Sequence, residues 1–300
     1  MAQKPNIFNY IGASVRFALF WLWGLSSAVV ALFVRKGTSF GPKFLRFFMR
    51  VEMRLAKIKV RVSGELSKSR PLLIVGNHIS IFEIATFPVA FGNSFFAKKE
   101  MEKFPLVGWL SKKFGVIYID RRPSQALAAL AALRDSMAKA TWPMALFPEG
   151  TTTNGAYVKE FKSTLFNFME DQLNAPAARE LRVESLESIG KETSQLSRQG
   201  RVTLQPVVML YRHRDGSKIS DEEMAEQYAY FDNAKQDFGP HCSRERSWMA
   251  QLFHIFMLGG FMVEMHVLAP VKPPLAGIKD RKELAAMLHK TVSDKYMELK

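Results

Sequence analysis

Residues 71–83 read Pro-Leu-Leu-Ile-Val-Gly-Asn-His-Ile-Ser-Ile-Phe-Glu, and the rest of the chain is organised around this stretch. Its first six residues form a short apolar run that is typical of a buried strand. His78 and Glu83 follow the strand end and stand five positions apart. In such a pair the imidazole can take a proton from a hydroxyl, while the carboxylate fixes its tautomer and stabilises the imidazolium. Taken alone, a histidine at a helix start is more often a capping or packing residue.

Apolar strand-like runs alternate with helical stretches from residue 71 onward. The expected strands lie at 71–76, 94–97, 116–119, 143–148, 202–210 and 262–268. The clearest helical stretch between them is 124–140, where Pro123 and Ser124 mark the start and leucines recur on one face. This alternation predicts an α/β fold at residues 61–300, with a mixed sheet flanked by helices and functional loops at the strand ends.

Residues 1–60 differ in character and are predicted to form N-terminal membrane-anchoring helices. Residues 17–34 carry no charge, and as a helix they would measure about 27 Å, close to the roughly 30 Å hydrocarbon core of a bilayer. Residues 40–60 combine an apolar stripe with flanking lysines and arginines, the pattern of a helix on an anionic membrane surface. The alternatives are a cleaved signal peptide and an ordinary amphipathic helix packed on the domain.

Charge predicts which partners and which compartment the chain meets. Basic residues are denser after the apolar segment than before it, so the following domain is expected on the cytoplasmic side of the inner membrane. The formal net charge of +14 favours anionic partners. We expect a phospholipid membrane and no nucleic acid, because the basic residues gather beside the membrane segment and do not interleave with exposed aromatics.

The residue inventory argues against several other kinds of site. The single cysteine, Cys242, excludes an intrachain disulfide and a thiolate-rich metal site. The six histidines form no ligand-spaced pair, which disfavours a zinc enzyme. The chain has no GxSxG motif, which disfavours a serine hydrolase. From the residues alone, neither a thiolate-rich metal site nor a zinc centre is therefore expected.

Three further stretches place polar groups at strand ends. Residues 115–122 end an apolar strand with Arg121, whose guanidinium can bind phosphate in a bidentate manner. Residues 147–155, Phe-Pro-Glu-Gly-Thr-Thr-Thr-Asn-Gly, bring a carboxylate, two glycines and three hydroxyls that can cradle an oxyanion or a polar headgroup. Residues 204–208 form an apolar strand broken by Pro206, which we expect at a sheet edge or bulge, shaping a channel wall. Each stretch alone also fits a structural role.

In order and separation, these four blocks resemble the glycerolipid acyltransferase superfamily. The blocks read NHxxxxE, GxxxxDR, FPEGT and xPVV. Members of the superfamily include bacterial 1-acylglycerol-3-phosphate acyltransferases and relatives that act on other lysolipids. The resemblance covers roughly residues 40–275. It implies an α/β domain on a two-helix membrane anchor, with an acyl-chain tunnel. It also implies a metal-independent transfer reaction that uses no cofactor, with acyl-CoA or acyl-carrier protein as co-substrate.

The resemblance also implies a role for each matching residue. His78, next to Asn77, would deprotonate the acceptor hydroxyl, and Glu83 would orient the imidazole. The hydroxyl would attack the thioester of acyl-CoA or acyl-carrier protein, with no acyl-enzyme. The residues that would bind the lysolipid acceptor or its acyl chain are Asn77, Arg121, Glu149, Gly150, Thr151, Thr152 and Pro206. Lys98 and Lys99 are added as basic candidates on charge alone.

The sequence departs from the superfamily pattern at three places. Glu83 stands where the first block usually ends in Asp, so its side chain is one methylene longer. Thr152 stands where members that form phosphatidic acid carry a phosphate-binding Arg, and the EGTTTNG form is more similar to members that acylate lysophosphocholine-type or lyso-ornithine lipids. Residues 174–201 resemble a solvated insertion. Lysophosphatidate, another lysophospholipid and lyso-ornithine lipid all stay open as acceptors, and an inactive membrane-binding homologue is the alternative to an enzyme.

Overall fold

The computed structural model describes most of the chain, and the statements below concern the described residues only. They are residues 6–33, 40–80, 82–99, 102, 108–111, 116–119, 133–137, 140–173, 201–228, 248–273, 275 and 277–300. Arg121, Cys242 and residues 174–200 of the expected insertion therefore lie outside the described residues. Of the helix expected at 124–140, residues 133–137 and 140 are described; 133–137 is helical and Ala140 is not.

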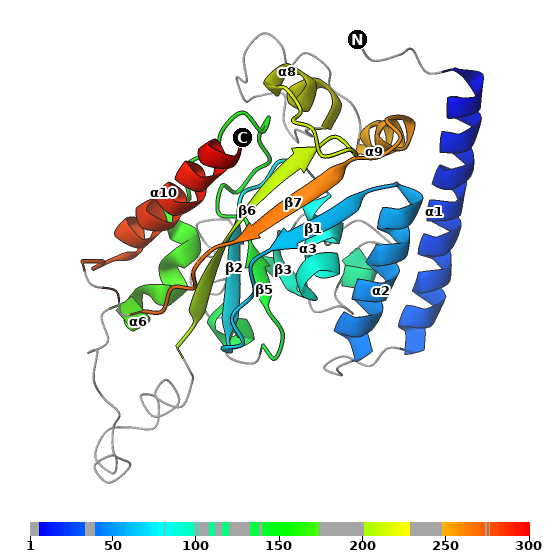
Figure 1. Ribbon diagram of the computed structural model, residues 1–300. Coiled ribbons are helices and arrows are strands. Elements are labelled where there is room, and N and C mark those ends of the chain that lie inside the picture. The colour runs from blue at the N-terminus through cyan, green and yellow to red at the C-terminus, as the bar shows by residue number, and fades with distance from the viewer. Residues whose placement is uncertain are drawn as a thin grey trace.

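A seven-stranded sheet forms the centre of the fold, in the order β1-β7-β6-β2-β5-β3-β4 (Figure 1). The strands are β1 Lys59–Ser63, β2 Leu72–Gly76, β3 Ser94–Lys98, β4 Ile117–Ile119, β5 Met144–Leu146, β6 Thr203–Arg212 and β7 Met262–Val267. β6 and β7 pair antiparallel and every other neighbouring pair is parallel, so the sheet is mixed. The predicted α/β class is confirmed.

Six of the seven strands match the apolar runs in the sequence, and β1 does not. All ten residues of β6 and all five of β2 are buried, which explains why apolar residues predominate in both. β1 lies at the edge of the sheet, and four of its five residues are exposed. Lys59 and Arg61 alternate with valines there, so the strand lacks the apolar signal that identifies the others.

The expectation of a sheet edge at Pro206 is wrong, whereas the expected bulge lies directly beside it. Pro206 bonds to Leu268, but two residues earlier Leu204 pairs with Val271, so the strand after β7 carries one extra residue between these pairs. β6 is an inner strand between β2 and β7, and Pro206 pairs in register with Val75. The Pro206 carbonyl accepts the N–H of Leu268, directly after β7, at 3.0 Å. The Leu268 carbonyl, which an N–H at position 206 would reach in a regular antiparallel ladder, accepts the side-chain amide of Gln205. Gln205 thus replaces the donor that proline lacks.

Helices lie on both sides of the sheet, with α10 on one side and α1 and α2 on the other (Figure 1). The helices are α1 Ile7–Phe33, α2 Phe40–Leu55, α3 Glu83–Phe91, α6 Glu170–Leu173, α8 Asp221–Glu223, α9 Trp248–Met257 and α10 Arg281–Leu299. A 3-10 helix, Ser163–Met169, precedes α6, and a π-helical turn, Met224–Tyr228, follows α8.

α1 is the one described helix long and apolar enough to cross a membrane. One face of it packs on α9, where the Phe17 ring lies 5.2 Å from that of Phe253 and 5.4 Å from that of Phe256. The Arg16 guanidinium donates to the Phe256 carbonyl at 2.7 Å. α1 is therefore docked on the domain along one side, and its other side is apolar and exposed.

α2 uses part of its apolar stripe for packing. Leu45, Phe48 and Met53 are buried, whereas Phe47 is 53% exposed. Arg46 donates from Nε to the Val89 carbonyl and from Nη2 to the Ala90 carbonyl, both at 3.0 Å. These carbonyls belong to the last turn of α3, where a cation is favourable. α2 is thereby joined to the helix that begins at Glu83.

Candidate active site

The loops after β2 and β5 form the candidate site. Because these two strands are parallel neighbours, their carboxyl ends meet at the same edge of the sheet. β2 ends at Gly76 and leads into Asn77 and His78, and β5 ends at Leu146 and leads into the 147–155 loop. The fold thus brings the first and third sequence blocks together.

His78 and Glu83 form the predicted pair. Nδ1 of His78 lies 2.8 Å from Oε2 of Glu83, and the N–H of Ser80 donates to the same oxygen at 2.9 Å. Glu83 is the first residue of α3, where a negative charge is favourable to the helix dipole. Its side chain is fully buried, while that of His78 is 20% exposed. The extra methylene of Glu83 does not break the contact.

The His78 ring is held flat against Phe147. The two ring centroids are 4.7 Å apart and the planes are 18° from parallel. Since Nδ1 is engaged by Glu83, Nε2 is the ring nitrogen that a substrate hydroxyl can approach. The arrangement is that of a general base with a fixed tautomer.

Glu149 holds the backbone of His78. Its Oε1 accepts the N–H of His78 at 2.6 Å, and its Oε2 accepts the N–H of Lys159 at 2.8 Å. The N–H of Thr153 donates to the His78 carbonyl at 2.9 Å. Burial raises the pKa of Glu149 to about 8, while the two N–H donors act in the lowering direction. The carboxyl group lies behind the His78 backbone and positions it.

Asn77 continues the sheet beyond the end of β2. Its side-chain amide donates to the Met209 carbonyl at 2.9 Å and accepts the Met209 N–H at 2.7 Å. Asn77 is 2% exposed, and its side chain binds β6 in place of a backbone pair. It fixes the position at which the chain turns into His78.

Gly150 lies in the turn of the FPEGT block with a positive φ of 72°. A Cβ at this position would come within 2.9 Å of Nζ and 3.0 Å of Cδ of Lys162. The Lys162 side chain therefore lies across the Gly150 backbone, which requires a glycine. Thr152 is 7% exposed and Thr151 is half-buried.

The other candidates either make no described hydrogen bond to His78 or have side chains outside the described residues. Pro206 is buried in β6 at the level of Val75. Lys99 forms an ion pair with Glu102 and is exposed. Lys98 ends β3, but its side chain, like Arg121, is outside the described residues. In the part of the chain that the structure describes, no three His, Cys, Asp or Glu side chains gather as metal ligands. The expectation that no metal or cofactor is needed stays a prediction.

Tyr211 contacts Glu83, and none of the four sequence blocks predicts this contact. Tyr211 lies on β6, and its hydroxyl donates to Oε1 of Glu83 at 2.6 Å. Burial, followed by the charge of Glu83, raises the pKa of Tyr211. All ten positions of β6 are buried, and Tyr211 follows the apolar run 207–210, so a phenol at the end of that run is the sequence signal it gives.

Comparison with known families decides the class. The family model described as Acyltransferase matches residues 57–209, which contain the whole His78–Glu149 site. The chain belongs to this acyltransferase family. The four-block resemblance is therefore confirmed.

Individual relatives of this acyltransferase match shorter parts. A lyso-ornithine lipid O-acyltransferase of Pseudomonas aeruginosa is 35% identical over 107 residues, 36% of this chain and 41% of the relative. A second, of Brucella abortus, is 27% identical over 154 residues, 51% and 57% of the two chains. The chain spans about half the length of these curated relatives.

A solved structure matches nearly the whole chain. It is the crystal structure of the 1-acyl-sn-glycerophosphate acyltransferase from Thermotoga maritima, with a TM-score of 0.57 and 16% identity over 98% of both chains. At this identity the likeness shows the fold alone. The likeness in fold includes α1 and α10, which lie outside the family match at residues 57–209.

Proposed function

We propose that this protein is a lysolipid O-acyltransferase, which transfers a fatty acyl group from acyl-CoA or acyl-carrier protein to the free hydroxyl of a lysolipid. The observation that carries the proposal is the 2.8 Å contact between His78 and the buried carboxylate of Glu83, with the imidazole partly open to solvent. Membership of the acyltransferase family supports the same reaction class.

The pair supplies the proton transfers that acyl transfer needs. Nε2 of neutral His78 removes the proton of the acceptor hydroxyl while the oxygen attacks the thioester carbonyl. The tetrahedral intermediate then expels the thiolate, which takes the proton from the imidazolium, so the products are an ester and a free thiol. Glu83 keeps the other ring nitrogen protonated and stabilises the imidazolium. General-base catalysis of this kind contributes about 10²–10⁴-fold.

Lyso-ornithine lipid is the acceptor that the site supports best. Thr152 stands where phosphatidic-acid-forming members of the superfamily carry a phosphate-binding arginine. Lyso-ornithine lipid carries a carboxylate and no phosphate, so its headgroup needs fewer positively charged ligands in the site. Lys162, whose ammonium lies across Gly150, supplies a cation at the turn. The matched Pseudomonas and Brucella relatives are named for this acceptor.

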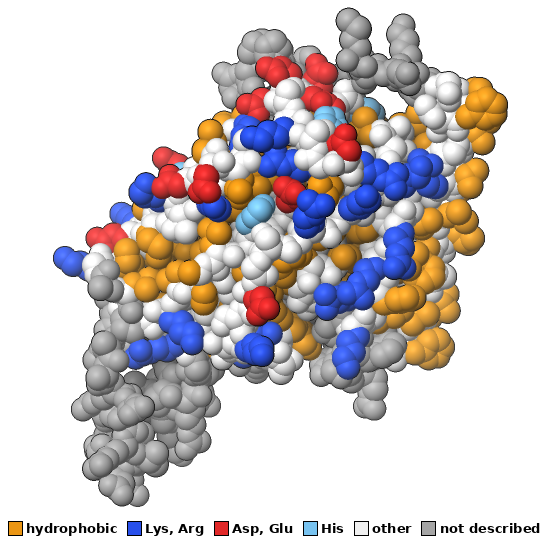
Figure 2. Space-filling view, in the orientation of Figure 1, with side chains coloured by type: hydrophobic (Ala, Val, Ile, Leu, Met, Phe, Trp, Pro, Cys, Tyr) orange, Lys and Arg blue, Asp and Glu red, His pale blue; other side chains and the backbone are white. Residues whose placement is uncertain are grey.

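The exposed face of α1 is proposed to enter the cytoplasmic leaflet of the inner membrane. Figure 2 shows apolar side chains gathered along α1. Those more than half exposed are Ile7, Phe8, Ile11, Val15, Leu22, Leu25, Val29, Leu32 and Phe33. Such a surface favours lipid over water. The anchor would bring the site to a membrane-borne acceptor and to anionic phospholipids.

Acyl transfer by the purified full chain tests this proposal. The protein in detergent is given radiolabelled acyl-CoA or acyl-carrier protein with lyso-ornithine lipid, lysophosphatidate or lysophosphatidylcholine. We expect product with lyso-ornithine lipid, and none with His78→Ala. Product with lysophosphatidate alone would refute the acceptor assignment, and no product with any pair from a folded protein would refute the transferase itself.

A further inference from the structure

The carboxylate of Glu83 is held at three points. Oε2 faces Nδ1 of His78 and the N–H of Ser80, and Oε1 accepts the Tyr211 hydroxyl at 2.6 Å. A glutamate has one more rotatable bond than an aspartate, so fixing it costs more side-chain entropy. The two donors on Oε2 hold one oxygen, and Tyr211 holds the second. The phenol therefore fixes the plane of the carboxylate.

Tyr211 is itself firmly placed. It is 2% exposed, and its ring centroid lies 4.8 Å from that of Phe261 and 6.3 Å from that of Tyr228. Its backbone pairs with Val263 of β7, in the interior of the sheet. A donor on an inner strand moves little, so the phenol can fix the position of the carboxylate at the end of the longer Glu83 side chain.

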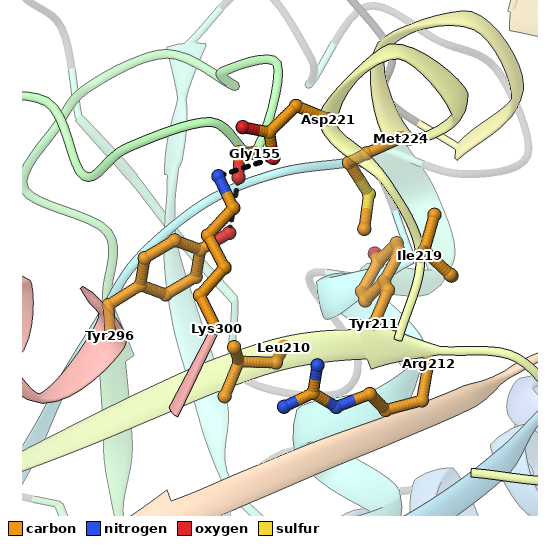
Figure 3. Close-up of a pocket in the computed structure, with 9 residues that line it drawn as sticks. All are labelled: Gly155, Leu210, Tyr211, Arg212, Ile219, Asp221, Met224, Tyr296 and Lys300. Carbon is orange, nitrogen blue, oxygen red and sulfur yellow. Dashed lines mark hydrogen bonds and ion pairs between the residues drawn. The ribbon is translucent and has the colours of Figure 1, made fainter. Parts of the chain in front are cut away.

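Tyr211 belongs to the hydrophobic core, and it also lines a small pocket. Figure 3 shows it across the pocket from Tyr296 and Lys300, with Ile219 and Met224 nearby. Removing the whole ring would open a path from this pocket toward the buried carboxylate. Removing the hydroxyl alone leaves the ring packing intact, which makes Tyr211→Phe the informative variant.

We propose that Tyr211 is a positioning residue that lets Glu83 serve where superfamily members use an aspartate. It acts through Glu83, and the inference rests on the proposed role of His78 as the general base. Donation from the phenol holds Oε2 against Nδ1 and keeps the carboxylate from rotating. It also withdraws negative charge from the carboxylate, so the pair binds its proton less tightly than it would without the phenol.

Loss of the hydroxyl should therefore change turnover and its pH dependence together. One hydrogen bond to a charged group predicts a fall in kcat of about tenfold or more for Tyr211→Phe, with the acceptor KM nearly unchanged. The acid limb of the kcat–pH profile should move to higher pH, because the pair then holds its proton more tightly. A purely structural role would leave that limb in place.

A double-mutant cycle with Glu83→Asp tests the link to the longer side chain. An aspartate carboxylate held by His78 no longer reaches the phenol, so Tyr211→Phe should cost less than about twofold in the Glu83→Asp background. The matched control is Tyr228→Phe, a buried tyrosine that packs on the same Phe261 ring and makes no described hydrogen bond to Glu83 or His78. It should keep the wild-type kcat within about twofold, as expected for a site outside the network.

A readout that does not need turnover separates this inference from the proposed function. The Nδ1–H proton of His78, hydrogen-bonded to a carboxylate, gives a downfield NMR resonance that should shift or broaden in Tyr211→Phe and not in Tyr228→Phe. An unchanged resonance, an unchanged pH profile, or an equal loss in the Glu83→Asp background would each overturn the assignment. Absence of acyl transfer by the wild type would refute the proposed function, while the NMR comparison would still decide on Tyr211.

Discussion

The backbone N–H of His78 donates to Oε1 of Glu149 at 2.6 Å, across 71 positions of sequence. This bond joins the turn after β2 to the turn after β5. The carbonyl of His78 is held from the same loop, by the N–H of Thr153 at 2.9 Å. The third sequence block therefore holds the first in place, and both oxygens of its carboxyl group accept backbone N–H groups. The expected contribution of Glu149 to acceptor binding stays a prediction.

Replacing Glu149 by Gln should weaken these contacts. The amide keeps one acceptor oxygen, but its NH₂ then faces the N–H of either His78 or Lys159. A buried donor left without an acceptor costs about 1–3 kcal/mol, and the imidazole loses its fixed position. We expect a lower urea midpoint together with a lower kcat. The control is Glu160→Gln, an exposed neighbour, and equal effects of the two variants would contradict this role of Glu149.

Chemical replacement of Glu83 separates charge from geometry. Glu83→Gln keeps the size of the side chain but cannot stabilise an imidazolium, so kcat should fall by about two to four orders of magnitude. Glu83→Asp keeps the charge and should retain readily measured turnover. Steady-state kinetics with the acceptor that supports transfer gives both values. If the Gln variant turned over at the wild-type rate, Glu83 would have no part in the chemistry.

Gly150 offers a test of the close approach of Lys162. A Cβ at this position meets the Lys162 side chain at 2.9 Å, and φ is +72°. A left-handed backbone costs a non-glycine residue about 1–2 kcal/mol, so Gly150→Ala should lower the free energy of unfolding by at least that amount. Thermal unfolding measures it. Gly24→Ala is the control, because it meets no atom within 4 Å.

Lys162 should matter for acceptor binding more than for turnover. Lys162→Met keeps the aliphatic chain across Gly150 and removes the charge. We expect a rise in the KM for lyso-ornithine lipid of about tenfold, as for the loss of one charge-assisted contact to its carboxylate, with kcat nearly unchanged. Lys162→Arg should restore most of the affinity. An unchanged KM in the Met variant would remove this lysine from the acceptor site.

How much of this site the sequence predicts depends on how far apart its residues lie in the chain. His78 and Glu83 are five positions apart, so their pairing follows from a strand end and a helix start. Tyr211 lies 128 positions from Glu83, and no local pattern joins them. Pro206 misleads for a related reason, since the amide that replaces its missing donor belongs to a side chain and reaches residue 268. Apolar runs in the sequence predict the strands, whereas contacts between side chains far apart in the chain depend on tertiary packing and follow from no local pattern.

Glu52 predicts a pH dependence of stability that is independent of the active site. It lies on α2, 8% exposed, and burial raises its pKa to about 8 from an ordinary value of 4.5. A carboxyl group whose pKa is raised on folding binds its proton more tightly when folded. Its stabilising contribution is therefore full below pH 4.5 and is lost as the pH rises through about 8.

Glu52→Gln should remove this dependence. Urea unfolding in detergent between pH 5 and pH 8 should show stability falling with pH in the wild type by up to roughly 1.4 kcal/mol per pH unit from this group. In Glu52→Gln the decrease in unfolding free energy per pH unit should be smaller by the contribution of Glu52. Glu65→Gln, at an exposed position, should leave the slope unchanged. A wild-type slope that persists in Glu52→Gln would assign it to other groups.

The two sides of α1 should respond differently to substitution. Leu22 and Val29 face outward, 63% and 58% exposed, whereas Phe17 packs against the rings of Phe253 and Phe256. The double variant Leu22→Asn, Val29→Asn should keep the thermal midpoint. Because apolar surface drives insertion, it should also float less with vesicles of anionic and zwitterionic phospholipid. Phe17→Ala should do the reverse, since deleting a packed ring costs about 3–5 kcal/mol when fully buried and less here. If the outward variant lost stability and kept its vesicle binding, α1 would be a packing helix and the membrane contact would lie elsewhere.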